Sequence, residues 1–211
     1  MYICTSDMNN SQQETTWSEN VILVDADYVD RVAFNLIVNF ERMIGRQIPK
    51  ASMAQWVDCV ALDGGLRPGE HQTQVVLIHS RAKQQMDNFS PSDFAVELNG
   101  KAFKDHLGEF ALDAYTTEED ITNHGDFFVD ALSLIAAQKQ VKRLMVIPNA
   151  EDGYIYNKVR EALRRVDDEE MRVTVFAMQP MPGGNFRQEI LGYSLMAALG
   201  IRSEEINQDI N

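Results

Sequence analysis

Residues 21–27 read Val21-Ile22-Leu23-Val24-Asp25-Ala26-Asp27, an apolar run that ends in two carboxylates. Four consecutive β-branched or leucyl residues are too few for a helix and are typical of a strand buried on both faces of a parallel sheet. In open α/β sheets, ligands and metals bind in the crevice at the carboxyl ends of the strands. Asp25 and Asp27 are therefore the first candidates for a functional site.

Helices and strands alternate along the rest of the chain. Apolar residues recur at three- and four-residue spacing from Tyr28 to Ile44, which predicts a helix that ends at Gly45. Strands that alternate with helices need crossover connections, so we expect a three-layer α/β/α domain with a mainly parallel sheet of about five strands. The other expected elements are a helix over 53–62, a strand over 74–80, helical pieces within 90–107, a strand over 110–115, a helix over 126–138, a strand over 144–147, a helix over 154–166, a strand over 172–178 and a last helix over 186–199.

Length and composition are those of one globular domain. The 211 residues, 45% hydrophobic and 24% charged, are enough for one sizeable core. We expect a polar N-terminal arm over residues 1–20, without the basic and apolar segments of a secretory signal, and a single domain over residues 21–211. No apolar run reaches the roughly 20 residues that span a bilayer, so we expect no membrane partner.

The cysteines and the net charge indicate which cellular location and which partners to expect. Cys4 and Cys59 have no metal-ligand spacing around them, which favours reduced thiols and a cytoplasmic protein. The formal charge of −13 argues against broad, sequence-independent attraction to nucleic acid, because that attraction depends on Lys and Arg.

Acidic side chains recur where predicted strands end or helices begin. Asp25 and Asp27 follow the first strand, Asp126 lies at a helix start, and Glu151 and Asp152 follow the strand over 144–147. If the first and fourth strands are neighbours, these ends meet in one crevice. Clustered carboxylates repel one another unless protons or a hard divalent cation neutralise them. The pattern therefore predicts a Mg²⁺ or Mn²⁺ site suited to phosphodiester hydrolysis.

The order of three sequence pieces resembles the NYN family of PIN-like nucleases. The pieces are an apolar strand ending in Asp (Val21 to Asp25), a Gly-x-Asp segment that opens a helix (His124-Gly125-Asp126), and a strand leading into an acidic loop (Leu144 to Asp152). The resemblance implies a PIN/NYN-like fold and a divalent-metal-dependent ribonuclease. In this leading hypothesis, Asp25, Asp126 and Asp152 bind the metal and are catalytic, Asp27 supports the metal, and Arg81 or Lys83 faces the phosphate of RNA.

Two departures from the family pattern leave a rival open. Tyr28 stands where the family has Asn, and Pro148-Asn149-Ala150 stands where Ser-Gly-Asp is expected. The rival is a catalytically inactive protein-interaction domain of the same fold, and the apolar last helix could supply a homodimer interface. A third alternative rests on Asp25-Ala26-Asp27 together with Ser80 and Lys83, which resemble the haloacid-dehalogenase-type phosphohydrolases.

Each acid also has a purely structural interpretation. Asp25 could be a solvated strand end, since Asp is a common turn residue. Asp126 lies where capping and the helix dipole favour a carboxylate, and Asp152 could likewise begin a helix. His79 ends an apolar strand and could be a ligand, a base or a buried, hydrogen-bonded histidine.

Overall fold

The apolar run of residues 21–24 forms the centre of a sheet. The structure, a computed structural model, describes residues 17–117 and 122–206. In it β1 (Asn20–Asp25) lies between β3 (His71–Ser80) and β7 (Arg143–Ile147), and both pairings are parallel. The four apolar side chains of β1 are fully buried. The prediction of a central strand buried on both faces is confirmed.

The main sheet has seven strands in the order β5-β6-β3-β1-β7-β8-β9. Its remaining members are β5 (Lys101–Asp105), β6 (Gly108–Thr117), β8 (Arg172–Ala177) and β9 (Arg187–Ile190). Neighbouring strands are parallel except for the antiparallel pair of β5 and β6. A separate two-stranded sheet joins β2 (Ala51–Ser52) to β4 (Phe89–Ser90).

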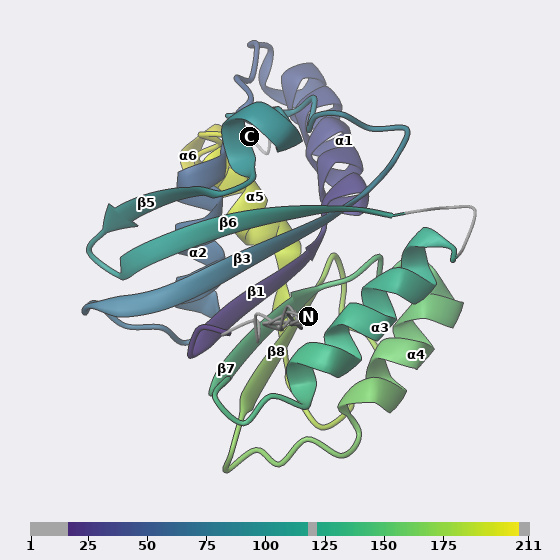
Figure 1. The fold of residues 1–211 in the computed structure, drawn as a ribbon. Coiled ribbons are helices and arrows are strands. Elements are labelled where there is room, and N and C mark those ends of the chain that lie inside the picture. Colours follow the sequence, from purple (N-terminus) through teal and green to yellow (C-terminus); the bar gives the residue numbers. More distant parts are fainter. Residues whose placement is uncertain (1–16, 118–121, 207–211) are drawn as a thin grey trace, which may run out of the picture.

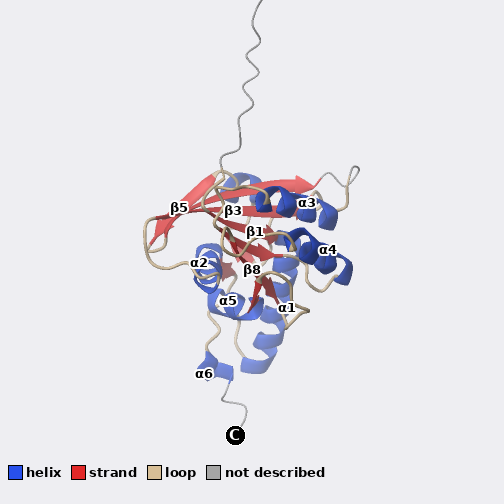
Figure 2. Cartoon of the chain, turned by 90° about the horizontal axis from the view of Figure 1, so that it is seen from below, coloured by secondary structure: helices blue, strands red, loops and turns tan. Residues whose placement is uncertain are grey.

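Helices cover both faces of the main sheet, which gives the expected three layers (Figures 1 and 2). On one face lie α1 (Ala26–Ile44), α2 (Met53–Asp63) and α5 (Leu191–Ala198), whose apolar residues share a core with Ile22 and Val24. On the other face α3 (His124–Ala136) and α4 (Gly153–Leu163) pack against Val21 and Leu23. A π-helical turn, η1 (Phe94–Leu98), and a short helix, α6 (Ser203–Ile206), complete the described elements.

The two outermost strands differ from the sequence prediction. Residues 101–105, expected among helical pieces, form β5 because Gly100 at φ +68° ends η1 and the chain then pairs with β6. Residues 187–190, expected within the last helix, form β9 because their backbone pairs with β8. Neither strand shows in the local periodicity, because each depends on pairing with a neighbouring strand. They raise the strand number of the main sheet above the expected five.

Other sequence expectations hold or lie outside the described residues. The helix predicted to end at Gly45 does so, with Gly45 at φ +68°. Within residues 17–117 and 122–206, no helix is long and apolar enough to cross a bilayer. Most of the expected N-terminal arm, including Cys4, lies outside the described residues, and Cys59 is a free thiol.

Candidate functional site at the carboxyl edge of the sheet

The carboxyl ends of β1 and β7 lie side by side, as the sequence hypothesis required. The chain leaves β1 toward β3 on one side and returns to β7 on the other, so this point is the switch point of the sheet, where α/β proteins bind ligands. Asp25 ends β1 here. A hollow of about 190 Å³ opens beside it, lined by Tyr28, Ala150, Glu151, Ala177, Met178, Gln179 and Met181.

Asp25 joins three elements through one carboxylate oxygen. Its Oδ1 accepts a hydrogen bond from the Tyr28 backbone N–H at 3.0 Å, which caps α1. The same oxygen lies 3.0 Å from Nε2 of His124, the first residue of α3. The Asp25 side chain is only 4% exposed, so this pair lies in a poorly solvated position. Asp25 is therefore already engaged by the protein itself.

A hydrogen-bond chain continues from His124 into the sheet. Thr117 donates its hydroxyl hydrogen to the His79 carbonyl at 3.2 Å, and its Oγ1 lies 2.9 Å from His124 Nδ1. The Thr117 hydroxyl thus joins the His79 carbonyl to the His124 ring, whose other nitrogen contacts Asp25.

His79 itself is buried and fully hydrogen-bonded. Its Nδ1–H donates to the carbonyls of Ser80 and Lys83 at 3.0 and 3.1 Å, and its Nε2 accepts from the Thr116 hydroxyl at 3.2 Å. The ring stacks on Phe94 with 3.8 Å between centroids. The structure therefore favours the buried, hydrogen-bonded histidine over the ligand or base.

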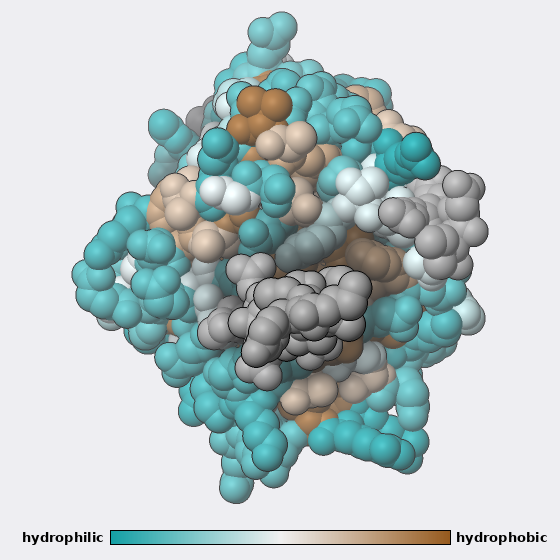
Figure 3. Space-filling view, viewed as in Figure 1, coloured by the Kyte–Doolittle hydropathy of each residue, from teal (hydrophilic) through white to brown (hydrophobic). Residues whose placement is uncertain are grey.

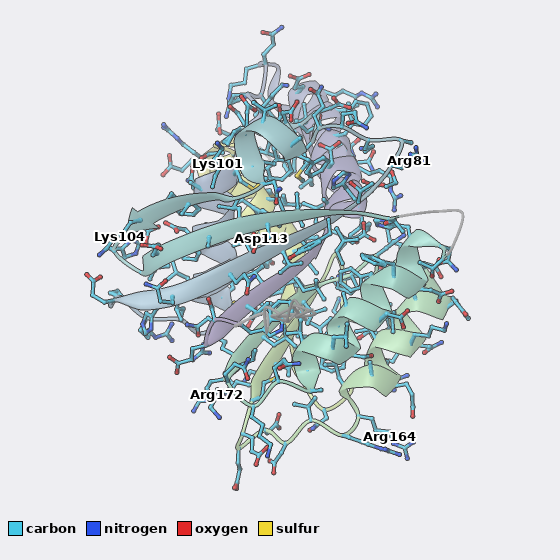
Figure 4. All side chains as sticks on the ribbon, viewed as in Figure 1. Arg81, Lys101, Lys104, Asp113, Arg164 and Arg172 are labelled. Carbon is cyan, nitrogen blue, oxygen red and sulfur yellow. The ribbon has the colours of Figure 1, made fainter. Side chains whose placement is uncertain are left out.

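The acids of the first turns of α1 hold the loop after β3. Asp27 Oδ2 accepts from the Ser80 backbone N–H at 3.2 Å, whereas Asp27 Oδ1 is buried without a hydrogen-bond partner. Asp30, which is 2% exposed, pairs with Lys83 Nζ at 2.8 Å. The Lys83 ammonium thus neutralises a buried carboxylate. Arg81 lies exposed on the turn after β3 (Figure 4).

Asp126 and Asp152 stabilise the first turns of α3 and α4. Asp126 Oδ1 accepts from Lys158 Nζ at 2.6 Å, and that hydrogen bond lowers the pKa of Asp126. Asp152 Oδ1 caps α4 by accepting from two backbone N–H groups, those of Tyr154 at 2.9 Å and Ile155 at 3.3 Å. Both side chains adopt the structural roles that a helix start favours.

The four proposed metal ligands do not form one ligand set. Over residues 17–117 and 122–206, the only three His, Cys, Asp or Glu side chains with ligand atoms mutually within 4.8 Å are Asp58, Asp105 and His106. Asp58 lies on α2, Asp105 ends β5 and His106 follows in the turn to β6, away from this edge. Ala150, which is 3% exposed, offers no ligand in the loop after β7. The residues at the carboxyl edge therefore do not fit a preformed Mg²⁺ or Mn²⁺ site.

Several residues that shape this edge carried no clear sequence signal. Arg31 of α1 reaches the loop after β7, where its Nη2 lies 3.5 Å from Asn149 Oδ1 and 3.8 Å from Glu151. The Tyr28 hydroxyl is buried without a hydrogen-bond partner, and burial raises the pKa of Tyr28. Gly125 owes its place to packing, because a Cβ there would lie 2.3 Å from Ile155 Cδ1.

These observations define the class of protein. It is a mixed α/β domain with a mainly parallel sheet, and the acids at its switch point are bound by other groups of the chain. A model described as a family of unknown function, DUF6621, matches residues 14–206. The chain belongs to this family. No curated protein and no solved structure matches the chain significantly.

Proposed function

We propose that the chain is a PIN/NYN-like α/β domain that acts through protein contacts and not through metal-dependent RNA cleavage. The observation that carries the proposal is the engagement of Asp25, whose Oδ1 is held by both the α1 cap and the His124 ring. The adjacency of β1 and β7, which the sequence hypothesis required, supports the PIN/NYN-like part of the proposal.

The other acids support the same conclusion. A divalent ion at this edge would have to displace Lys158 from Asp126 and two backbone N–H groups from Asp152. Mg²⁺ demands near-ideal octahedral geometry, so carboxylates fixed in other hydrogen bonds are poor ligands for it. The formal charge of −13 also opposes approach of an RNA backbone.

The surface offers an apolar region that suits contact with a protein. A hollow of about 230 Å³ lies between the sheet and α3, and Tyr115 and Leu134 on its margin are 43% and 65% exposed. Figure 3 shows brown apolar surface on this face within a mostly hydrophilic exterior. Exposed apolar patches rimmed by polar residues are typical of interaction surfaces.

A Mn²⁺ titration followed by melting temperature tests the proposal. An ion that binds only the folded state at a hundredfold excess over its Kd stabilises that state by about 2.7 kcal/mol, which raises the melting temperature measurably. We expect no metal-dependent rise, and no Mn²⁺-dependent cleavage of a single-stranded RNA. A rise that Asp126→Asn abolishes and Asp130→Asn preserves would contradict the proposal, because Asp130 is an exposed acid on the same helix.

A metal-dependent ribonuclease is the second candidate, and one observation favours it. Asp27 Oδ1 is buried at the carboxyl edge without a hydrogen-bond partner, and a Mg²⁺ or Mn²⁺ ion there would provide one. In this case Asp25 and Asp27 would hold the ion and RNA would be the substrate. A Mn²⁺-induced rise in melting temperature that is lost in Asp27→Asn would support this candidate.

The partner that can be tested at once is a second copy of the chain. Sedimentation velocity over a range of concentrations separates monomer from homodimer. If the native chain dimerises and Leu134→Asp does not, the apolar hollow is a homodimer interface. A chain that stays monomeric directs the search to a different protein.

A further inference from the structure

Three consecutive parallel strands begin with arginine at the amino edge of the sheet, opposite the acids described above. Arg143, Arg172 and Arg187 are the first residues of β7, β8 and β9. Arg143 and Arg172 are direct partners in the register of β7 and β8, so their side chains lie on the same face. Like charges side by side in a sheet are destabilising. A compensating negative charge is therefore needed.

No described Asp or Glu side chain forms an ion pair with these arginines. Within the described ranges, no Asp or Glu oxygen lies within 4.0 Å of the guanidinium groups of Arg143, Arg172, Arg187 or the nearby Arg67. By contrast, Arg46 pairs with Glu205 at 2.7 Å. Burial, followed by the charges of Arg172, Arg67 and Arg187, lowers the pKa of Arg143, and the negative charge of Glu19 opposes this shift in part.

Arg143 is held in place and still has an unused donor. Its Nη1 donates to the Gly64 carbonyl at 2.7 Å, whereas its Nε is buried without a hydrogen-bond partner. Gly65, at φ +89°, lets the backbone approach this guanidinium, since a Cβ there would lie 2.9 Å from Nη1. The loop after α2 thus fixes the Arg143 side chain before any ligand arrives.

Two hollows meet at Arg172. The first, of about 310 Å³, is lined by Glu19, Asn20, Gly65, Leu66, Arg67, His71, Lys142, Arg143, Glu169, Glu170 and Arg172. The second, of about 260 Å³, is lined by Asp168, Arg172, Val173, Gly184, Asn185, Phe186 and Arg187. Glu19, Glu169 and Glu170 are exposed and ion-pair with none of the four arginines. Arg172, also exposed, lines both hollows.

We propose that this edge binds a small molecule with a diphosphate group, whose two adjacent phosphates both face Arg172 where the hollows meet. Arg143 and Arg67 would contact the first phosphate and Arg187 the second. The guanidinium fork matches phosphate oxygens in geometry. A diphosphate offers several anionic oxygens to these guanidinium groups, whereas a carboxylate offers two.

Calorimetric titration with sodium pyrophosphate at low salt tests the proposal. We expect Arg172→Gln to weaken binding by roughly tenfold or more, since a charge-assisted hydrogen bond is lost to each phosphate. Arg164→Gln is the matched control: Arg164 is an exposed arginine at the end of α4 that lines neither hollow, and Figure 4 shows both arginines. It should bind like the native chain. Both arginines are exposed, and an unchanged melting temperature shows that the fold is intact.

Three outcomes would overturn the proposal. The first is no binding of pyrophosphate by the native chain at millimolar concentration. The second is equal weakening by Arg164→Gln, which would mark a general charge effect. The third is that orthophosphate or a single-stranded RNA binds as tightly as pyrophosphate, because the site would then recognise one phosphate or a polymer backbone. None of these results bears on metal binding at the carboxyl edge.

Discussion

The two edges of the sheet carry opposite charges. They differ in whether those charges form ion pairs within the chain. At the carboxyl edge, acids find partners within the chain: Asp25 has His124, Asp30 has Lys83 and Asp126 has Lys158. At the amino edge, Arg143 and Arg172 lie in register, and no carboxylate of the described residues lies within 4.0 Å of their guanidinium groups. A charge that the chain neutralises itself contributes to the fold. A charge without an ion pair is available to a ligand, as we propose for the arginines of the amino edge.

Asp25→Ala should lower the free energy of unfolding more than the other substitutions. It tests whether the carboxyl edge is a structural element. It removes a helix cap, which costs about 1 kcal/mol, and breaks a poorly solvated pair, which costs about 3 kcal/mol or more. We expect the free energy of unfolding, measured by urea denaturation, to fall accordingly. Asp130→Ala, an exposed acid, should change it by less than about 0.5 kcal/mol. A similarly small effect of Asp25→Ala would mean that the edge is not structural.

Gly108→Ala, at the amino edge, should cause the next largest decrease in the free energy of unfolding. Gly108 has φ +115°, and a Cβ there would lie 2.2 Å from the His71 carbonyl oxygen, where β6 approaches β3. We expect a loss of more than about 1 kcal/mol in the free energy of unfolding. Gly153→Ala is the control, because a Cβ at Gly153 meets nothing within 4 Å. Equal effects of the two substitutions would contradict the close approach.

The dependence of stability on pH should show a moderate effect of the carboxyl pair Asp58 and Asp105, near the amino edge. Burial and the neighbouring Asp105 raise the pKa of Asp58 to about 7. The folded state thus holds a proton that the unfolded state releases near pH 4, so stability should fall as the pH rises from about 4 through 7. Asp58→Asn should flatten this fall in thermal melts. An unchanged pH profile would assign the fall to other groups.

Lys158→Met should have the smallest effect on stability of the substitutions proposed. The Lys158–Asp126 pair is partly exposed, with side chains 39% and 27% accessible, and such pairs contribute little. We expect a small decrease in melting temperature at low salt that disappears at high salt, because salt screens exposed charges. Lys139→Met, an exposed lysine without an ion pair, should show no salt-dependent change. A large, salt-independent loss for Lys158→Met alone would show that packing of the side chain dominates.

The sequence was sufficient for the central architecture. The uninterrupted apolar run of residues 21–24 predicted β1, and three- and four-residue spacing predicted α1 up to Gly45. It was insufficient for β5 and β9, since each forms through pairing with one neighbour. A strand whose backbone is satisfied on one side only has little local pattern of its own.

The sequence predicted where the candidate site lies. It did not predict which groups of the chain bind its acids. The end of an apolar strand located Asp25 at the switch point. Spacing could not show that His124, 99 residues later, would lie against its oxygen. The arginine edge had no signal at all, because Arg143, Arg172 and Arg187 meet only after two connections bring β7, β8 and β9 together.

The outermost strands bear on how copies of the chain could assemble. β5 is a five-residue strand with exposed Lys101 and Lys104, both visible in Figure 4. At the opposite margin, the four-residue β9 exposes Arg187 and Glu189. Short, charged margins resist the addition of a further strand. Two copies would therefore not join their sheets edge to edge into one continuous sheet.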